Sequence, residues 1–332
     1  MDFVKEMRQK AKALQKKLVL PEGTEPRTVK AARIIADEGL VASVTLVGTE
    51  ADVQSVAAKE GVKLEGITIV NPAASPLAGA YAHEYYELRK KKGMTEEQAK
   101  IDMVDPLRWG AMMVRKGDAD AMVAGADNAT AAVLRAGLAI IGAVPGLKTA
   151  SSCFVIQTTD PAWGVDGALI FSDCAVVPDP TDEQLADIAE SAAQSCREFL
   201  NAEPVVALLS FSSKGSGGDL ADALKVKSAY ERLKAKQPNF VFDGELQADA
   251  ALVPSVTDKK APGSPIRGKV NTLVFPDLGA GNIGYKLVQR LGKAEAFGPF
   301  LQGFAKPISD LSRGASVEDI VVTCAVTLSR AK

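Results

Sequence analysis

A hydroxyl, a guanidinium and a carboxylate fall close together near the end of the chain, as Ser312, Arg313 and Asp319. They lie in the stretch 308–319, just before the final predicted helix. Groups of these three kinds can hold an anion and move a proton. This segment is therefore the best candidate for the reacting centre.

The same segment also has a purely structural interpretation. Ser316-x-x-Asp319 matches a capping box, with Ser316 as the N-cap and Asp319 in the first turn of the helix. A carboxylate at that position also interacts well with the helix dipole. From these residues alone, both the catalytic and the capping role of Asp319 stay open.

A second candidate site follows a predicted strand at 119–124. The turn from Gly125 to Thr130 opens a helix that runs through Arg135 to Ile141. Free N–H groups and the dipole at a helix N-terminus favour an anion such as phosphate. Alternatively, Asp127 or Asn128 is simply the N-cap. The two interpretations are equally supported, and one turn can serve both.

Two more segments suggest anion binding. The strand 205–209 runs into a Ser/Gly-rich loop, 210–218, with a single lysine, Lys214. It is not a Walker A loop, because GxxxxGK[ST] is absent. The loop is either a flexible connection or a phosphate cradle. Its position between a strand and a helix favours the cradle. Arg89, followed by three lysines, either complements a helix C-terminus or forms a cationic lip for an anionic ligand.

The run Gly279-x-Gly281-x-x-Gly284 follows a predicted strand at 272–275 and matches the dinucleotide fingerprint. The predicted helix after it, 285–291, is short, and no strand ending in an acid lies about twenty residues further on. The simpler interpretation is that the glycines allow tight turns and close backbone approach.

Predicted strands and helices alternate in the part of the chain that must position these groups. Strands predicted at 17–20, 43–47 and 66–70 are separated by helices at 28–38 and 51–59. Short apolar strands alternating with helices predict a parallel sheet covered on both faces. The stretch 142–146 is typical of a domain junction, and 332 residues are too many for one ordinary core, so we expect two domains.

Composition narrows the class of protein. A net charge of -2 argues against a nucleic-acid surface, and no apolar run is long enough to span a membrane. The charged, amphipathic start is unlike a signal peptide. A single histidine, His83, argues against histidine-based metal sites and a Ser-His-Asp triad. The four cysteines form no CxxC pair, as expected for buried thiols in a cytoplasmic protein.

Taken together, several stretches resemble the phosphate acetyltransferase (phosphotransacetylase) family nearly from end to end. They are Leu20–Gly23, Tyr86–Lys90, Ala124–Thr130 with Leu134-Arg135, Ser210–Ser216, Phe242–Gln247, Phe275–Leu278 with Gly281–Ile283, and Asp310–Gly314 with Asp319.

The resemblance implies acetyl transfer between acetyl phosphate and coenzyme A, which bind as substrates, with no tightly bound cofactor and no metal in the chemistry. It also implies two α/β/α doubly wound domains with mainly parallel sheets and an active site in the cleft between them. The first domain would comprise residues 1–146 and 297–332, and the second 147–296. A cytoplasmic homodimer without nucleic-acid or membrane partners is expected.

The family's essential residues match Arg89, Arg135, Ser312, Arg313 and Asp319. Thiolate would attack the acetyl carbonyl directly in a ternary complex, with Asp319 taking the thiol proton. Arg313 would neutralise the phosphoryl charge, and Ser312 would hydrogen-bond the developing oxyanion. The further residues expected to bind substrate or coenzyme A are Asn128, Thr130, Ser212, Lys214 and Asn282.

Three alternatives stay open. A phosphate butyryltransferase-like enzyme would share the fold and take a longer acyl chain. An NAD(P)-dependent dehydrogenase would use the glycine run, and a non-catalytic anion-binding protein would hold acetyl phosphate without turnover.

Overall fold

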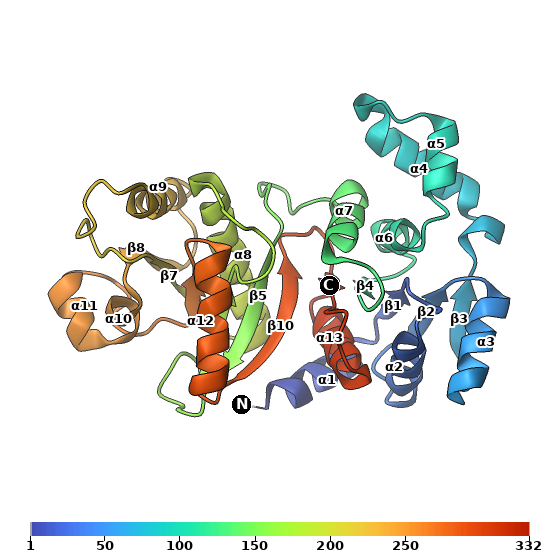
Figure 1. Ribbon diagram of the computed structural model, residues 1–332, viewed down its shortest axis with the longest axis horizontal. Coiled ribbons are helices and arrows are strands. Elements are labelled where there is room, and N and C mark those ends of the chain that lie inside the picture. The colour runs from blue at the N-terminus through green and yellow to red at the C-terminus, as the bar shows by residue number, and fades with distance from the viewer. Residues whose placement is uncertain (1, 332) are drawn as a thin grey trace. The chain divides into compact units, whose positions relative to one another are not determined.

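The computed structural model describes residues 2–331, which divide into two compact units. The discontinuous unit takes Asp2–Pro145 and returns from Phe304 onward, whereas the continuous unit is Gly146–Gly303. Each unit contains one sheet with helices on both faces. The α/β fold with mainly parallel sheets is therefore confirmed (Figure 1). The position of the active site in a cleft between the domains stays a prediction.

The discontinuous unit is built around a five-stranded sheet in the order β11-β4-β1-β2-β3, with all neighbours parallel. Its strands are β1 (Lys17–Leu20), β2 (Ser43–Val47), β3 (Ile67–Val70), β4 (Ala121–Ala124) and β11 (Ile308–Asp310). Its helices are α1 (Phe3–Leu14), α2 (Pro26–Asp37), α3 (Glu50–Glu60), α4 (Ala78–Arg89), α5 (Glu96–Asp102), α6 (Pro106–Lys116), α7 (Thr130–Ile140) and α13 (Val317–Ser329), with short 3-10 turns η1 (Pro72–Ala74) and η2 (Lys90–Lys92).

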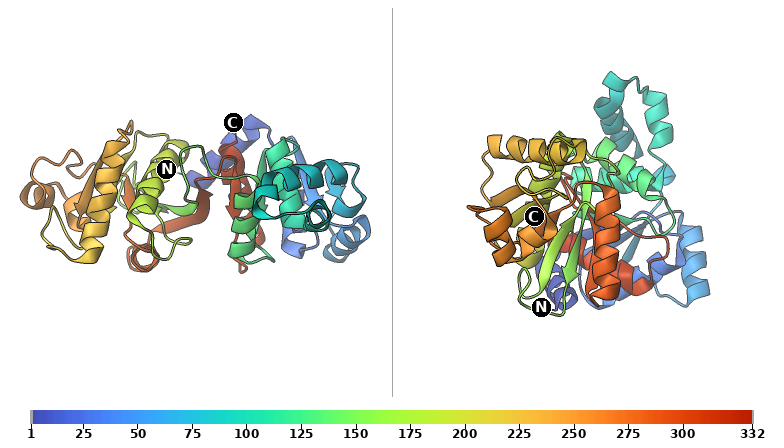
Figure 2. Two further views of the ribbon diagram at one scale, coloured as in Figure 1. Left: turned by 90° about the horizontal axis from the view of Figure 1, so that it is seen from above. Right: turned by 60° about the vertical axis from the view of Figure 1, so that its left-hand side comes forward.

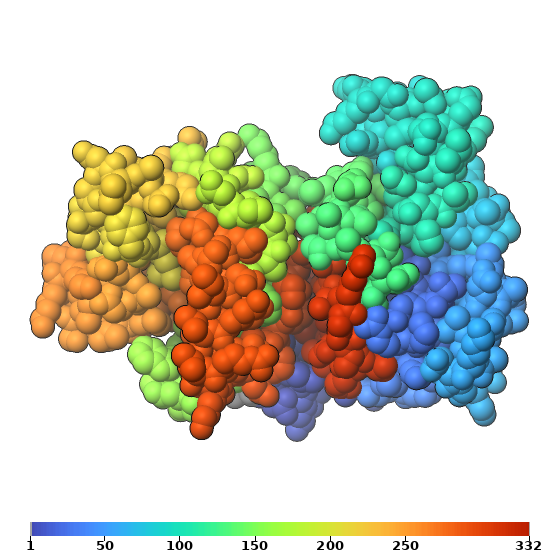
Figure 3. Space-filling model, in the orientation of Figure 1, coloured from blue at the N-terminus to red at the C-terminus, as the bar shows by residue number. Residues whose placement is uncertain are grey.

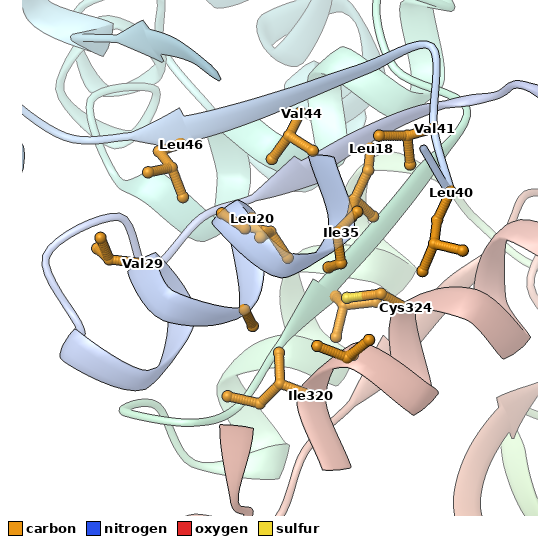
Figure 4. Close-up of a cluster of buried hydrophobic side chains, with 14 of the residues drawn as sticks. Leu18, Leu20, Val29, Ile35, Leu40, Val41, Val44, Leu46, Ile320 and Cys324 are labelled. Atoms are coloured by element: carbon orange, nitrogen blue, oxygen red, sulfur yellow. The ribbon is translucent and has the colours of Figure 1, made fainter. Parts of the chain in front are cut away.

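Alternate residues of each strand enter two different cores. Leu18 and Leu20 of β1 lie with α2, α3 and α13 in the core drawn in Figure 4. Val19, between them, lies with α4, α6 and α7 on the opposite face. Successive side chains of a strand point to opposite faces, so a sheet covered on both sides needs apolar residues throughout. Helix α5 and the end of α4 project together beyond the other helices of this unit (Figures 1 and 2).

The continuous unit has a six-stranded sheet in the order β10-β5-β6-β9-β7-β8. The pairs β6–β9, β9–β7 and β7–β8 are parallel, and β10–β5 and β5–β6 are antiparallel. Its strands are β5 (Ser151–Gln157), β6 (Ala168–Ser172), β7 (Val205–Leu209), β8 (Val241–Leu246), β9 (Thr272–Val274) and β10 (Glu295–Gln302). Its helices are α8 (Asp182–Leu200), α9 (Ala221–Ala235), α10 (Ala248–Leu252), α11 (Pro254–Lys260) and α12 (Leu278–Leu291).

The side chains of the buried strands of the continuous unit also alternate between the two faces of their sheet. Ala207 and Leu209 of β7 share a core with α10, α11 and α12. Val206 and Leu208 are equally buried and point to the other face, against which α8 packs. No helix within residues 2–331 is both long enough and apolar enough to cross a membrane.

The return to the discontinuous unit comes later than the sequence predicts. The sequence places residues 297–303 in the first domain, but β10 pairs with β5 of the second sheet, and the chain returns at Phe304. The sequence pattern does not predict this strand, because Gly298-Pro299 interrupts its apolar residues. In the structure this dipeptide is a bulge, where the register shifts between Phe297 and Phe300.

Candidate active site

Three loops meet where β1, β4 and β11 end. In a parallel sheet the carboxyl ends of neighbouring strands lie at one edge, where open α/β sheets bind ligands. Asp310, the last residue of β11, stands beside Ala124, the last residue of β4. Just beyond them the Leu311 amide donates to the Ala124 carbonyl at 2.8 Å. The loop that begins at Gly125 and the loop that carries Ser312 and Arg313 are therefore neighbours.

The turn from Gly125 to Asn128 holds an anion, and that anion is the chain's own Glu22. The buried Glu22 carboxylate accepts hydrogen bonds from the main-chain N–H groups of Gly125, Ala126, Asp127 and Asn128, at 2.8–3.1 Å. The Asn128 side-chain amide adds another at 2.9 Å. Successive N–H groups that point to one spot form such an anion nest.

This arrangement corrects both sequence interpretations of the turn. Neither Asp127 nor Asn128 caps α7, because the N-cap is Ala129 and it has no side-chain cap. An anion site exists, but the amides that phosphate would need are already donors to Glu22. The turn itself does not reveal its occupant, since Glu22 lies about a hundred residues earlier, after β1.

Thr130 is joined to a buried acid that the sequence patterns do not single out. Its hydroxyl donates to the Asp310 carboxylate at 2.5 Å. Burial raises the pKa of Asp310 to about 6, and the nearby charge of Glu22 also acts to raise it, against the lowering effect of the Thr130 hydrogen bond. The only signal in the sequence is an acid at the last position of a strand in an α/β sheet.

The capping box at the start of α13 is confirmed. The Ser316 hydroxyl accepts from the Asp319 amide at 3.1 Å, and Asp319 Oδ2 accepts from the Ser316 amide and hydroxyl at 2.8 Å each. Only Oδ2 takes part. Within residues 2–331, Oδ1 of this exposed carboxylate has no hydrogen-bond donor, so it is open to a ligand. The cap and the catalytic role are therefore compatible.

Ser312 and Arg313 are exposed in the loop between β11 and α13. The Ser312 hydroxyl accepts from the Gly314 amide at 3.3 Å, which leaves its own proton available to a ligand. The guanidinium of Arg313 forms no ion pair with an acid of the described chain, so its charge is available too.

All three predicted arginines have guanidinium groups that form no ion pair within residues 2–331. Most other arginines of the described chain form ion pairs with acidic side chains. Between residues 2 and 331, Arg89, Arg135 and Arg313 have no acid at ion-pairing distance, and the same holds for Arg290 on α12. Nε of Arg89 is buried without a hydrogen-bond partner. Arg89 ends α4, which packs against α7, the helix of Arg135. Both are free to bind anions.

The Ser/Gly-rich loop of the continuous unit is held by internal acids. Ser212 is fully buried, and its hydroxyl donates to Glu245 at 3.0 Å. The Gly215 amide donates to the same carboxylate at 2.6 Å. Lys214 pairs with Asp243 and donates to the Gly244 carbonyl at 2.7 Å. The loop is therefore neither a loose connection nor an empty phosphate cradle, because its donors are already engaged.

The glycine run lies inside a helix. The predicted turn at 279–284 is wrong: α12 begins at Leu278, capped by Asp277. Gly281 is needed for close approach, since a Cβ there would stand 2.3 Å from the Asp173 carbonyl oxygen. Asn282 donates to the Cys174 carbonyl at 3.2 Å. A dinucleotide site needs these glycines in the loop before the helix, where they would meet the pyrophosphate.

The sequence-predicted residues thus fall into two groups. The discontinuous unit holds the unpaired arginines, Asp319 of the capping box, and the residues of the loops that follow β4 and β11. The continuous unit holds three side chains that form internal hydrogen bonds. The first group is Arg89, Asn128, Thr130, Arg135, Ser312, Arg313 and Asp319, and the second is Ser212, Lys214 and Asn282.

Comparison with known proteins identifies the class. The model of the phosphate acetyl/butaryl transferase family matches residues 2–328. The chain belongs to this family, and the protein is an acyltransferase.

Individual relatives also support membership of this family. The chain is 59% identical over 330 residues to a phosphate acetyltransferase of Treponema pallidum, covering 99% of this chain and 98% of the relative. Among solved structures, a phosphotransacetylase from Streptococcus pyogenes matches with a TM-score of 0.92 and 39% identity over 99% and 98% of the two chains. One from Staphylococcus aureus matches with a TM-score of 0.89 and 38% identity over 100% and 98%.

Proposed function

We propose that this protein is a phosphate acetyltransferase, which moves acetyl between acetyl phosphate and coenzyme A. The observation that carries the proposal is the 59% identity, along nearly the whole chain, to a relative of that name. The unpaired arginines of the discontinuous unit support it, because both substrates are anions rich in phosphate.

We assign the chemistry to the loop that follows β11. Asp319 Oδ1 takes the thiol proton of coenzyme A, while Oδ2 stays in the capping box and fixes the carboxylate. The thiolate attacks the acetyl carbonyl, the bond from the acyl carbon to the bridging oxygen breaks, and phosphate leaves with the bond electrons. Arg313 grips the phosphoryl group with two parallel hydrogen bonds, and Ser312 donates to the developing oxyanion.

We assign substrate binding to the remaining predicted residues. Arg89 and Arg135 bind phosphate groups of coenzyme A or of the acyl phosphate, because their guanidinium groups are unpaired. Asn128 and Thr130 contribute from the adjacent turn, although each now bonds an internal acid. Ser212, Lys214 and Asn282 are assigned to coenzyme A on the family resemblance, and each would exchange an internal partner for the ligand.

We also propose that the protein acts as a cytoplasmic homodimer without a tightly bound cofactor. Helix α12, orange in Figure 3, exposes Ile283, Leu287 and Leu291, which are 61%, 52% and 79% exposed. Spaced four residues apart, they form one apolar stripe that a second copy can cover. The four cysteines are buried and form no disulfide, which suits a reducing compartment. Sedimentation of the protein and of Leu287→Glu tests the dimer: the variant should sediment as a monomer.

The assay for the reaction measures thioester formation from coenzyme A with acetyl, propionyl and butyryl phosphate. The highest kcat/KM is expected with acetyl phosphate. A higher value with butyryl phosphate would assign the protein to butyryl transfer instead. Binding of acetyl phosphate without thioester formation would overturn the proposal.

A further inference from the structure

Arg27 joins the loop that carries Ser312 and Arg313 to the turn that follows β4. Its Nη1 donates to the main-chain carbonyls of Arg313 at 2.7 Å and Ala315 at 2.8 Å. Its Nη2 donates to the carbonyl of Ala126 at 2.8 Å. One planar group thus holds three carbonyls from two loops that lie nearly two hundred residues apart in sequence.

A hydrogen bond to Glu25 also fixes the guanidinium of Arg27. Its Nε donates to Glu25 Oε1 at 2.8 Å, and the other oxygen of Glu25 accepts from the Thr28 amide at 2.9 Å as the N-cap of α2. Arg27 occupies the first turn of α2, so its backbone is set by that helix. The planar, rigid fork of an arginine keeps such donors in fixed directions, whereas a lysine ammonium is a single point with no fork.

The loop that Arg27 holds lies outside helix and strand. Residues 311–316 belong to neither β11 nor α13. Inside the loop, the Ala315 amide bonds the Ser312 carbonyl at 2.9 Å, and the Gly314 amide bonds the Ser312 hydroxyl at 3.3 Å. The first of these bonds closes a β-turn with Arg313 and Gly314 at its centre. Arg27 ties this turn to α2 through the main-chain carbonyl of Arg313, the residue whose side chain grips the phosphoryl group.

We propose that Arg27 is a positioning residue for acyl transfer. It holds the main chain of Arg313 and Ala315 against the turn at Ala126, so that the side chains of Ser312 and Arg313 project at a fixed distance from their substrate. This inference rests on the proposed function of that loop. Arg27 needs no contact with substrate, and it acts on the turnover step rather than on binding of coenzyme A.

Arg33 supplies a matched control. It lies on the same helix, donates to the main-chain carbonyls of Lys63 at 3.4 Å and Glu65 at 2.8 Å, and pairs with Asp37. It therefore ties together two segments of the same unit at the β3 side of the sheet. Arg33→Ala should alter stability as Arg27→Ala does, without touching the loop at 311–316.

The test compares Arg27→Lys, Arg27→Ala and Arg33→Ala by kinetics. A misplacement of about 1 Å can lower a rate about 10²-fold, so kcat should fall by about that factor in both Arg27 variants. KM for coenzyme A should stay within about threefold of the parent. Added ethylguanidinium should restore part of the kcat of Arg27→Ala and none of that of Arg33→Ala. Parental kcat in Arg27→Lys, or an equal loss in Arg33→Ala, would overturn the proposal.

Hydrogen exchange separates this inference from the proposed function. Amides in a peptide covering 311–316 should exchange faster in Arg27→Ala than in the parent and in Arg33→Ala. Unchanged exchange overturns the positioning role whatever the activity. If exchange is faster but Arg313→Ala turns over at the parental rate, the positioning contact is real and the assignment of Arg313 to the chemistry is the part that fails.

Discussion

Replacing Glu22 with glutamine should destabilise the discontinuous unit strongly. The carboxylate receives four main-chain N–H groups and the Asn128 amide. In Glu22→Gln, the most favourable orientation of the new side-chain amide keeps its oxygen at the Oε1 position, where most of these donors point. The NH2 group of the new side chain then faces the Ala126 amide, whose acceptor was Oε2.

The size of the effect follows from two losses. A buried donor left without an acceptor costs about 1–3 kcal/mol, and hydrogen bonds to a charged acceptor are worth about 1.5–3 kcal/mol against about 1 kcal/mol for neutral ones. Together these losses predict about 3–5 kcal/mol for Glu22→Gln. The matched variant Glu60→Gln removes a surface ion pair to Lys30 and should cost at most about 1 kcal/mol.

Because two units need not unfold together, the assay must report on one of them. Urea-dependent hydrogen exchange of amides in β4 and β11 follows the discontinuous unit alone. Glu22→Gln should raise their exchange far more than Glu60→Gln does. If both variants change the opening free energy by the same small amount, the carboxylate does not hold the turn, and the nest would be available to a phosphate.

Three further predictions concern the arginines and Asp310. Arg89→Ala or Arg135→Ala should raise KM for coenzyme A or acetyl phosphate with little change in the unfolding midpoint; unchanged KM for both substrates in both variants would reject the assignment. Arg313→Lys should stay impaired at every pH, because the fork and not the charge is lost; recovery at high pH would contradict this. The pKa of Asp310, raised by burial to about 6, makes the folded state bind its proton more tightly than the unfolded chain. Stability should therefore fall as pH rises from about 4 to about 6, by up to about 3 kcal/mol. Asp310→Asn should flatten this part of the curve in urea titrations at several pH values, and an unchanged slope would exclude Asp310 as its source.

Local patterns predict most of the elements because local chemistry determines them. Strands such as 205–209 are short apolar runs, and the capping box at Ser316 needs only residues three apart. The strands that escape prediction lack this signal. Strand β10 is interrupted by Gly298-Pro299, and β11 is three residues long with two of them polar.

The site is harder to predict because its contacts are long-range. The turn at Gly125 indicates an anion, but only the pairing of β1 with β4 brings Glu22 to it. Arg27 reaches Arg313 across 286 positions of sequence, and Thr130 reaches Asp310 across 180. Sequence patterns show that donors are free at a helix start; they do not show which distant acid will satisfy them.

The most direct test of the proposed reaction compares two variants of one capping box. Ser316→Ala breaks the box but keeps the carboxylate, whereas Asp319→Asn also removes the base. Both should lose about 1 kcal/mol of stability. A thiol with a pKa of about 8.5 is only a few per cent ionised at neutral pH, so Asp319→Asn should lower kcat about 10²–10⁴-fold there, with a defect that shrinks as pH rises. Ser316→Ala should lower kcat far less, because the main-chain amide of residue 316 still holds Oδ2. If Asp319→Asn turns over at neutral pH as fast as Ser316→Ala, Asp319 is only a helix cap and the thiol proton goes elsewhere.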